Sequence, residues 1–271
     1  MSERPIAALP SALDDFASLE ARLGGRRAAV FLDYDGTLTP IVDRPDMAIL
    51  SPEARAVVAA LARRLPVAVI SGRDRADVER LVGVDGLVYA GSHGFDIRLP
   101  DGRELRHEAA GDVAPLLDRA ARWLERALSE IPGALIERKR FSLAAHYRLV
   151  APARAAAVRA AVDDALAAEP GRLKVKPGKM VFEVQPAMDW DKGKALLWLL
   201  RALGLDDAGV APLFLGDDVT DEDAFAVLRD RGVGIVVAAA HEVDGRATRA
   251  DFRLADPGEV LSFLRRLEGL R

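Results

Sequence analysis

Two aspartates stand one residue apart in the segment AAVFLDYDGTLTP, residues 28–40. The apolar residues 28–32 predict a buried strand, and Asp33 and Asp35 follow its end directly. Residues i and i+2 of an extended chain lie on the same face, so both carboxylates can address one ligand. Two close carboxylates repel each other and lose solvation when they are buried. We therefore expect a cation to neutralise them.

Polar residues also follow two other predicted strands. The segment PVAVISGR ends in residues 71–73, and the segment APLFLGDD ends in residues 216–218. Ligands of open parallel α/β sheets bind beyond the carboxyl ends of the strands, so we expect these residues to meet at one edge. Carboxylates from separate strands can hold Mg²⁺, which prefers oxygen ligands and keeps substrate phosphate in its coordination shell.

This combination of residues suits phosphoryl transfer. A carboxylate can attack phosphorus and form an acyl phosphate, while a second carboxyl protonates the leaving alcohol and then activates water. Gly36 allows the backbone to turn closely around a phosphate, and the hydroxyls of Thr37 and Ser71 can donate hydrogen bonds to its oxygens. Lys192, at the predicted start of a helix, is the candidate for balancing the phosphate charge.

Length, composition and charge limit the class of protein. The chain has 271 residues, a length typical of one large domain or two modest ones. Half of the residues are apolar, which is enough for a sizeable core. The net charge of -4 gives no basic field for nucleic acid. The sequence has no cysteine, which excludes disulfides and thiolate sites. Neither a signal-peptide pattern nor a membrane-length apolar run is present, so we expect a cytoplasmic protein without a membrane partner. The sequence does not indicate protein partners.

Strand and helix signals alternate up to about residue 97 and again from residue 191. Apolar strands alternating with helices predict an α/β fold with a parallel, Rossmann-like sheet covered on both faces. The block between them contains hairpin signals and two helices, which predict a separate α+β unit. We therefore expect a discontinuous catalytic core, residues 1–97 and 185–271, with an inserted cap, residues 98–184.

The acidic stretch that follows Asp217 predicts the N-terminus of a helix. Carboxylates are favourable there because of the helix dipole, so Glu222 and Asp223 are expected in the first turn. Thr220 is expected to be the N-cap.

The segments DYDGT, SGR, DKG and GDDVTDEDAF resemble, in this order, the four motifs of the haloacid dehalogenase (HAD) superfamily of phosphatases. The resemblance implies that Asp33 is the nucleophile and that Asp35 is the acid and base. It implies Mg²⁺ on Asp33, on Asp217 and on the backbone carbonyl of Asp35. The resemblance also implies Ser71 and Lys192 as phosphate-binding residues, and we expect Thr37 and Gly72 to bind phosphate with them.

Nearly the whole chain resembles the trehalose-6-phosphate phosphatase family, through GSHG, ERKRFSLAAHYR, KPGKMVFEVQP and GDDVTDEDAF. This resemblance implies Mg²⁺-dependent hydrolysis of a small-molecule sugar phosphate, trehalose 6-phosphate, through an aspartyl-phosphate. The residues implied for the sugar are Arg73, His93, Glu137, Lys139, Lys179 and Glu183. Lys179 and Glu183 also share one face of a predicted strand. Arg140 departs from the family, which commonly has a small residue there.

Three alternatives stay open at this point. The same chemistry can serve another sugar phosphate, such as sucrose phosphate or mannosylglycerate phosphate. The fold can also carry a non-catalytic sugar-phosphate sensor, or a sugar phosphomutase that shares the aspartyl-phosphate step. His146 and Arg148 lie on a predicted strand, where they either support the cap or line it.

Overall fold

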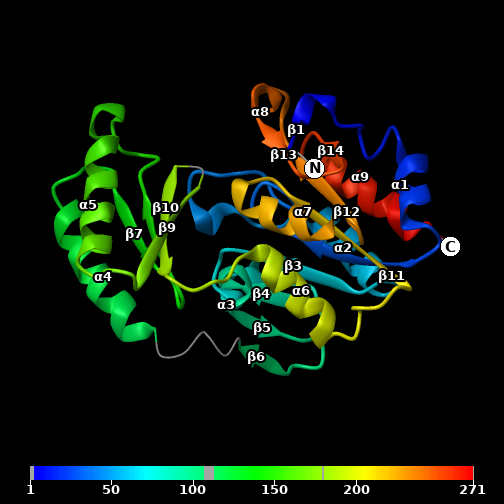
Figure 1. The fold of residues 1–271 in the computed structure, drawn as a ribbon, viewed down its shortest axis with the longest axis horizontal. Helices are drawn as coiled ribbons and strands as arrows, with labels where there is room; N and C mark the ends of the chain where they lie inside the picture. The colour runs from blue at the N-terminus through cyan, green and yellow to red at the C-terminus, as the bar shows by residue number, and fades with distance from the viewer. Residues whose placement is uncertain (1–2, 107–112, 179, 271) are drawn as a thin grey trace. The chain divides into compact units, whose positions relative to one another are not determined.

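The computed structural model describes residues 3–106, 113–178 and 180–270 (Figure 1). The chain divides into two compact units, residues 1–105 with 191–271, and residues 106–190. Among the described residues, the first unit has two buried apolar clusters and the second has one. Within the described ranges, no helix is both long enough and apolar enough to cross a membrane.

The first unit is built on a sheet that has eight strands within the described residues. The strands lie in the order β14 (Phe252–Leu254), β12 (Val233–Val237), β11 (Val210–Gly216), β2 (Arg27–Leu32), β3 (Val67–Ile70), β4 (Val88–Gly91), β5 (Asp96–Arg98) and β6 (Glu104–Arg106). Neighbours from β14 to β4 are parallel, whereas β5 pairs with β4 antiparallel. A short ladder of β1 (Arg4–Pro5) and β13 (Ala247–Thr248) lies apart from this sheet.

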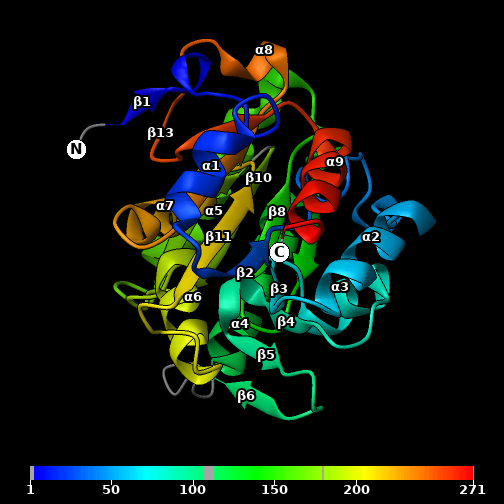
Figure 2. The same ribbon diagram turned by 90° about the vertical axis from the view of Figure 1, so that its right-hand side faces the viewer.

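Helices cover both faces of this sheet. They are α1 (Phe16–Leu23), α2 (Pro52–Ala62), α3 (Arg75–Val82), α6 (Lys192–Ala202), α7 (Glu222–Leu228), α8 (Ala240–Val243) and α9 (Pro257–Glu268), with 3₁₀ turns η1 (Ile6–Ala8), η2 (Pro45–Met47), η3 (Ser92–Gly94) and η6 (Val219–Asp221). Helices α1, α2, α3 and α9 pack with Val30 and Leu32 of β2, and α6 and α7 pack with Ala29 and Phe31 of the same strand. Figure 2 shows α6 and α7 on one side of the sheet and α2, α3 and α9 on the other. The predicted α/β fold is therefore confirmed.

Local sequence signals explain why α2 begins where it does. The Ser51 hydroxyl accepts a hydrogen bond from the Ala54 amide, and Pro52 occupies the first helical position. Ser is a favoured N-cap residue, and Pro is compatible with the first turn because its missing N–H would have no partner in the helix.

The second unit packs two helices on one face of an antiparallel sheet. The strand order is β7 (Leu135–Arg138), β8 (Leu143–His146), β10 (Val181–Pro186) and β9 (Leu173–Gly178), and the helices are α4 (Ala114–Leu128) and α5 (Ala155–Ala167), with a 3₁₀ turn η5 (Pro152–Arg154) before α5. Leu143 and Val184 of the sheet pack with Leu117 and Val158 of the helices. The strand register places Glu137, Ala144 and Glu183 in one row, on the face opposite to that of Leu143 and Val184.

The hairpin of β5 and β6 belongs to the sheet of the first unit, beyond β4. Its alternating pattern indicated a hairpin, but such a pattern does not specify which sheet the hairpin joins. At the other end, the segment up to residue 190 belongs to the second unit. The assignment of the units as catalytic core and cap stays a prediction.

Candidate active site

Three central strands bring their carboxyl ends to one edge of the first unit's sheet. Strands β3, β2 and β11 are parallel neighbours, and the Asp33 amide continues the ladder by donating to the Leu215 carbonyl at 2.9 Å. Carboxylate oxygens of Asp33, Asp217 and Asp221 lie within 4.8 Å of one another. All three side chains are buried. The structure therefore brings together Asp33 and Asp217, which the sequence placed 184 positions apart.

A buried lysine joins this aspartate cluster. Lys192 is the first residue of α6, whose N-cap Asp191 accepts a hydrogen bond from the Lys194 amide. Nζ of Lys192 donates to Oδ1 of Asp33 at 2.8 Å and to Oδ1 of Asp221 at 2.5 Å. The helix start thus places the ammonium group against the end of β2.

The charges in the cluster do not balance. With all three acids ionised, these carboxylates and the ammonium group together carry a formal charge of −2. Burial raises the pKa of Asp33 well above its usual range, although the ammonium of Lys192 acts against this. Burial alone would lower the pKa of Lys192, but Asp221 and Asp33 outweigh it and raise that pKa. A divalent cation would compensate this excess charge.

Asp221 is a site residue that the sequence analysis missed. Its Oδ2 accepts from the amides of Asp217 and Asp218, both at 2.9 Å, while its Oδ1 accepts from Lys192. Its position four residues after Asp217, in the 3₁₀ turn η6, lets it reach back to the end of β11. That spacing is the available signal, but it is equally typical of an acidic helix N-terminus without a further role.

The predicted N-cap in this stretch was wrong. The Asp218 carboxylate, and not the Thr220 hydroxyl, caps the turn by accepting from the Val219 amide at 2.7 Å. The helix α7 then begins at Glu222, so the expectation of Glu222 and Asp223 in its first turn is confirmed. The Glu222 carboxylate also accepts from the hydroxyl of Thr248 at 2.7 Å.

The other predicted acid, Asp35, is paired with Arg73. Nε and Nη2 of Arg73 donate to Oδ2 and Oδ1 of Asp35 at 2.7 and 2.6 Å. Nη1 of Arg73 donates to Asp77 Oδ2 at 3.0 Å, and the guanidinium carbon lies 5.4 Å from the centre of the Tyr34 ring. The structure thus places Arg73, which the resemblance assigns to the sugar, directly on Asp35.

The predicted phosphate-binding residues lie in the same loops. The buried hydroxyl of Thr37 has no hydrogen-bond partner among the described residues, and the Ser71 hydroxyl accepts from the Arg73 amide at 3.1 Å. A Cβ added to Gly72 would lie 2.9 Å from Cε1 of His93. His93 has a left-handed backbone with φ of 56°, and its amide donates to the Ser71 carbonyl at 2.8 Å. The loops after β3 and β4 therefore interlock.

The second unit brings its own predicted residues together. Nζ of Lys139 lies 3.0 and 3.3 Å from the two carboxylate oxygens of Glu183, and the Ser142 hydroxyl donates to Oε1 at 2.7 Å. Glu137 Oε2 lies 2.9 Å from Nε2 of His146. Acidic and basic groups thus lie in pairs on the sheet face opposite to α4 and α5.

Three further residues of this unit were singled out from the sequence. Lys179 lies outside the described residues. Arg140 is exposed, and its guanidinium lies 5.4 Å from the centre of the Phe141 ring. The role of Arg148 stays open.

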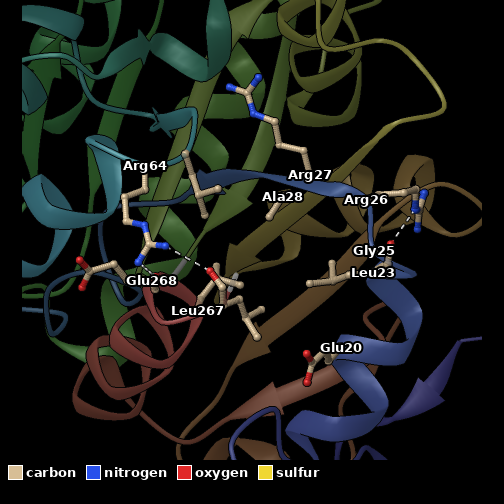
Figure 3. Close-up of a pocket in the computed structure, with 11 residues that line it drawn as sticks. Glu20, Leu23, Gly25, Arg26, Arg27, Ala28, Arg64, Leu267 and Glu268 are labelled. Atoms are coloured by element: carbon tan, nitrogen blue, oxygen red, sulfur yellow. Dashed lines mark hydrogen bonds between the residues drawn. The ribbon is translucent and has the colours of Figure 1, made fainter.

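A hollow of about 390 Å³ lies at the opposite end of β2 from Asp33. Leu23 and Leu267 line it, and Figure 3 shows Arg64 reaching toward the end of α9, where it donates to the backbone carbonyls of Glu268 and Leu270. These contacts cap a helix end, so the arginine serves the fold.

Comparisons with known proteins agree with the fold. The family model described as Trehalose-phosphatase matches residues 31–258. A trehalose-phosphate phosphatase of Mycobacterium tuberculosis strain H37Rv is 46% identical over 267 residues, which is 98% of this chain and 67% of that protein.

Two solved structures were also similar. The C-terminal domain of trehalose-6-phosphate phosphatase from C. albicans superposes with a TM-score of 0.81 and 26% identity, over 97% of this chain and 99% of that one. Trehalose-6-phosphate phosphatase from Aspergillus fumigatus gives a TM-score of 0.65 and 30% identity, over 96% and 99% of the two chains. The resemblance stated from the sequence is confirmed, and the chain belongs to the trehalose-phosphatase family.

Proposed function

We propose that this chain hydrolyses trehalose 6-phosphate to trehalose and phosphate through an aspartyl-phosphate. The observation that carries the proposal is the buried cluster of Asp33, Asp217, Asp221 and Lys192 at the strand ends of a chain in this family. The curated relative from Mycobacterium tuberculosis is named a trehalose-phosphate phosphatase, which supports the sugar.

Mg²⁺ fits this cluster. The donors are carboxylate oxygens, which Mg²⁺ prefers, and the buried excess of negative charge favours a divalent cation. Asp33, Asp217 and the backbone carbonyl of Asp35 are the proposed ligands, with Asp221 holding the amides of the loop beside them. When bound, Mg²⁺ would supply positive charge that stabilises the phosphate oxygens as charge develops on them.

Asp33 is proposed as the nucleophile. Its carboxylate oxygen forms a bond to phosphorus while the bond from phosphorus to the sugar oxygen breaks, and Asp35 gives a proton to that oxygen. Water then attacks phosphorus, Asp35 takes the proton from that water, and the bond from phosphorus to Asp33 breaks. The product is free phosphate, and both aspartates return to their starting state.

The phosphate oxygens need donors from the protein. Lys192 is already aimed at Asp33, and the buried Thr37 hydroxyl has no partner among the described residues, so it is able to donate to a ligand. Ser71 and Gly72 complete the proposed phosphate site from the loop after β3. Positioned donors of this kind stabilise the transferred group without reorganisation.

The second unit is proposed as the cap that binds the sugar. A polyhydroxyl ligand requires donors and acceptors on the same surface, and Glu137, Lys139 and Glu183 offer both on one sheet face. His93 and Lys179 are proposed with them from the resemblance, whereas Arg73, which the resemblance also implies, is held by Asp35. Location in the cytoplasm and the lack of a nucleic-acid partner stay predictions.

The test is the release of inorganic phosphate from a panel of sugar phosphates, with Mg²⁺ and with a chelator. We expect Mg²⁺-dependent release that favours trehalose 6-phosphate and falls by at least about a thousandfold in Asp33→Asn. Asp101→Asn, which changes an exposed carboxylate of the first unit in the same way, should match the unchanged protein.

The other outcomes each favour another function. Faster release from sucrose phosphate or mannosylglycerate phosphate would keep the chemistry and change the sugar. Binding without release would indicate a sugar-phosphate sensor. An isomerised sugar phosphate in place of free phosphate would indicate a phosphomutase.

A further inference from the structure

Arg73 is held from both sides by carboxylates. Its Nε and Nη2 form a two-bond fork with Asp35, and its remaining terminal nitrogen, Nη1, donates to Asp77 at 3.0 Å. Asp77 lies in the first turn of α3, four residues after Arg73. Every nitrogen of the guanidinium group therefore has an acidic partner, either in the loop after β2 or in α3.

Burial fixes the arginine more firmly than the acids it joins. The side chain of Arg73 is 10% exposed, whereas those of Asp35 and Asp77 are 34% and 36% exposed. The guanidinium also lies over the ring of Tyr34, itself fully buried. A planar group held in this way fixes the plane of the carboxylate that it binds through two hydrogen bonds.

We propose that Asp77 and Arg73 are positioning residues for Asp35. Asp77 orients the guanidinium group of Arg73, and that group orients the Asp35 carboxyl toward the reacting oxygen. The proposal rests on the proposed function, in which Asp35 gives a proton to the sugar oxygen and then takes one from water. A carboxyl group that serves both steps must face the reacting oxygen in each of them. Small displacements of such a group lower the rate.

The proposal gives Arg73 a different task from the sugar binding that the resemblance implies. The two tasks predict different kinetics. Loss of a group that positions the acid lowers kcat and leaves KM nearly unchanged, whereas loss of sugar binding raises KM. Asp77 has no assigned role in either step, so a change there reports on the arginine without removing it.

The test is a double-mutant cycle with Asp77→Asn and Asp35→Asn, assayed on trehalose 6-phosphate and on an aryl phosphate. We expect Asp77→Asn alone to lower kcat by about tenfold with KM within twofold. In the Asp35→Asn background the same change should have no further effect, because the carboxyl that it positions is gone. Asp77→Glu, which keeps the charge, should recover part of kcat.

Arg80→Ala is the matched control. Nη2 of Arg80, an exposed side chain, donates to the other oxygen of Asp77 at 2.6 Å, so this variant removes a contact of Asp77 without touching Arg73. We expect kcat to be unchanged in Arg80→Ala. Thermal unfolding of both variants should match the unchanged protein, so that a lower kcat in Asp77→Asn does not come from a misfolded sample.

The contrary outcomes are separate for the two proposals. A rise in KM with kcat unchanged, or an equal loss of kcat in both backgrounds, would overturn the positioning role and leave the phosphatase intact. No phosphate release by the unchanged protein from either substrate would overturn the proposed function and this inference with it.

Discussion

The carboxylate of Asp217 lies against the backbone of Gly36. A Cβ added to Gly36 would lie 2.2 Å from Oδ2 and 2.3 Å from Cγ of Asp217, closer than such atoms approach in proteins. Gly36 also has a left-handed backbone, with φ of 83°. The loop after β2 and the loop after β11 are therefore in contact, and only glycine satisfies both the space and the conformation at this point.

Replacing this glycine should damage both the fold and the site. Gly36→Ala would strain the backbone and displace Asp217 from the aspartate cluster. We expect the free energy of unfolding to fall by about 1–3 kcal/mol. Because the reacting groups move, we expect kcat for phosphate release to fall by about a hundredfold. Chemical unfolding and the phosphate assay measure the two effects.

Gly25→Ala separates the effect of backbone strain from the effect of the contact with Asp217. Gly25 also has a positive φ, 72°, but an added Cβ would meet no atom within 4 Å. This variant should lose about 1 kcal/mol of stability and no activity. If Gly36→Ala behaved in the same way as Gly25→Ala, the contact with Asp217 would have no importance for the site.

Ionisation of a buried tyrosine should lower the free energy of unfolding at alkaline pH. Tyr89, the second residue of β4, is buried, and its hydroxyl donates to the Val84 carbonyl at 2.6 Å. Burial raises the pKa of Tyr89 from 10.0 to about 12. A folded-state pKa above the unfolded one contributes stability that is present below pH 10 and is lost as the pH rises from about 10 to about 12.

Tyr89→Phe should reduce this pH dependence. Without the hydroxyl, we expect the decline in the free energy of unfolding between about pH 10 and pH 12 to become shallower. At neutral pH the variant should be about 1 kcal/mol less stable, because the Val84 carbonyl loses its donor. Unfolding by denaturant over this pH range measures both effects. An identical pH profile in the two proteins would contradict the assignment.

The sequence predicted the parts of the site that depend on local signals and on a general rule of parallel sheets. An apolar run before Asp33 indicated β2, and the alternation of strand and helix signals indicated a parallel sheet. The convergence of Asp33 with Asp217 followed from the rule that the carboxyl ends of parallel strands share an edge. Each of these needs only short stretches of sequence and one topology.

The parts that the sequence did not predict depend on pairings between distant segments. The fork between Arg73 and Asp35 joins residues 38 positions apart, and no periodicity encodes it. The contact of Asp221 with Lys192 requires that α6 begin beside η6. Asp35 lies in a loop and Asp221 lies just before a helix, and carboxylates are common at both kinds of position. Their residue type alone therefore does not predict the contacts with Arg73 and Lys192.

The buried hydroxyl of Ser142 should matter for sugar binding in the second unit. It donates to Glu183 Oε1, and both side chains are buried. Ser142→Ala removes a donor from a buried carboxylate, which we expect to destabilise this unit by about 1–3 kcal/mol. If Glu183 binds the sugar, KM for trehalose 6-phosphate should rise several-fold while kcat stays the same.

Ser129→Ala controls for the loss of a serine hydroxyl in the same unit. Ser129 is exposed, and its hydroxyl donates to the Arg126 carbonyl at the end of α4. Changes at such surface positions usually alter stability by less than about 0.5 kcal/mol. An unchanged KM in Ser142→Ala, with the expected loss of stability, would show that Glu183 does not contact the sugar.

Asp221→Asn should weaken metal binding, and this effect can be measured without an activity assay. The asparagine oxygen can still accept from the amides of Asp217 and Asp218, but its amide group would then face Nζ of Lys192, which also donates. We expect the affinity for Mg²⁺ to fall by about 10-fold to 100-fold, as for other groups that orient metal ligands. The readout is the rise in the thermal unfolding midpoint with Mg²⁺ concentration, which reports binding to the folded state.

Asp230→Asn is the matched control, because it removes one carboxylate charge from an exposed position of the same unit. We expect its midpoint to rise with Mg²⁺ as in the unchanged protein, and a chelator to abolish the rise in both. The Asp221→Asn curve should be displaced to higher Mg²⁺ concentration, because the buried cluster has lost one of its negative charges. Coincident curves for all three proteins would place Mg²⁺ outside this cluster, and the charge of Asp221 would then serve only to hold Lys192 and the loop after β11.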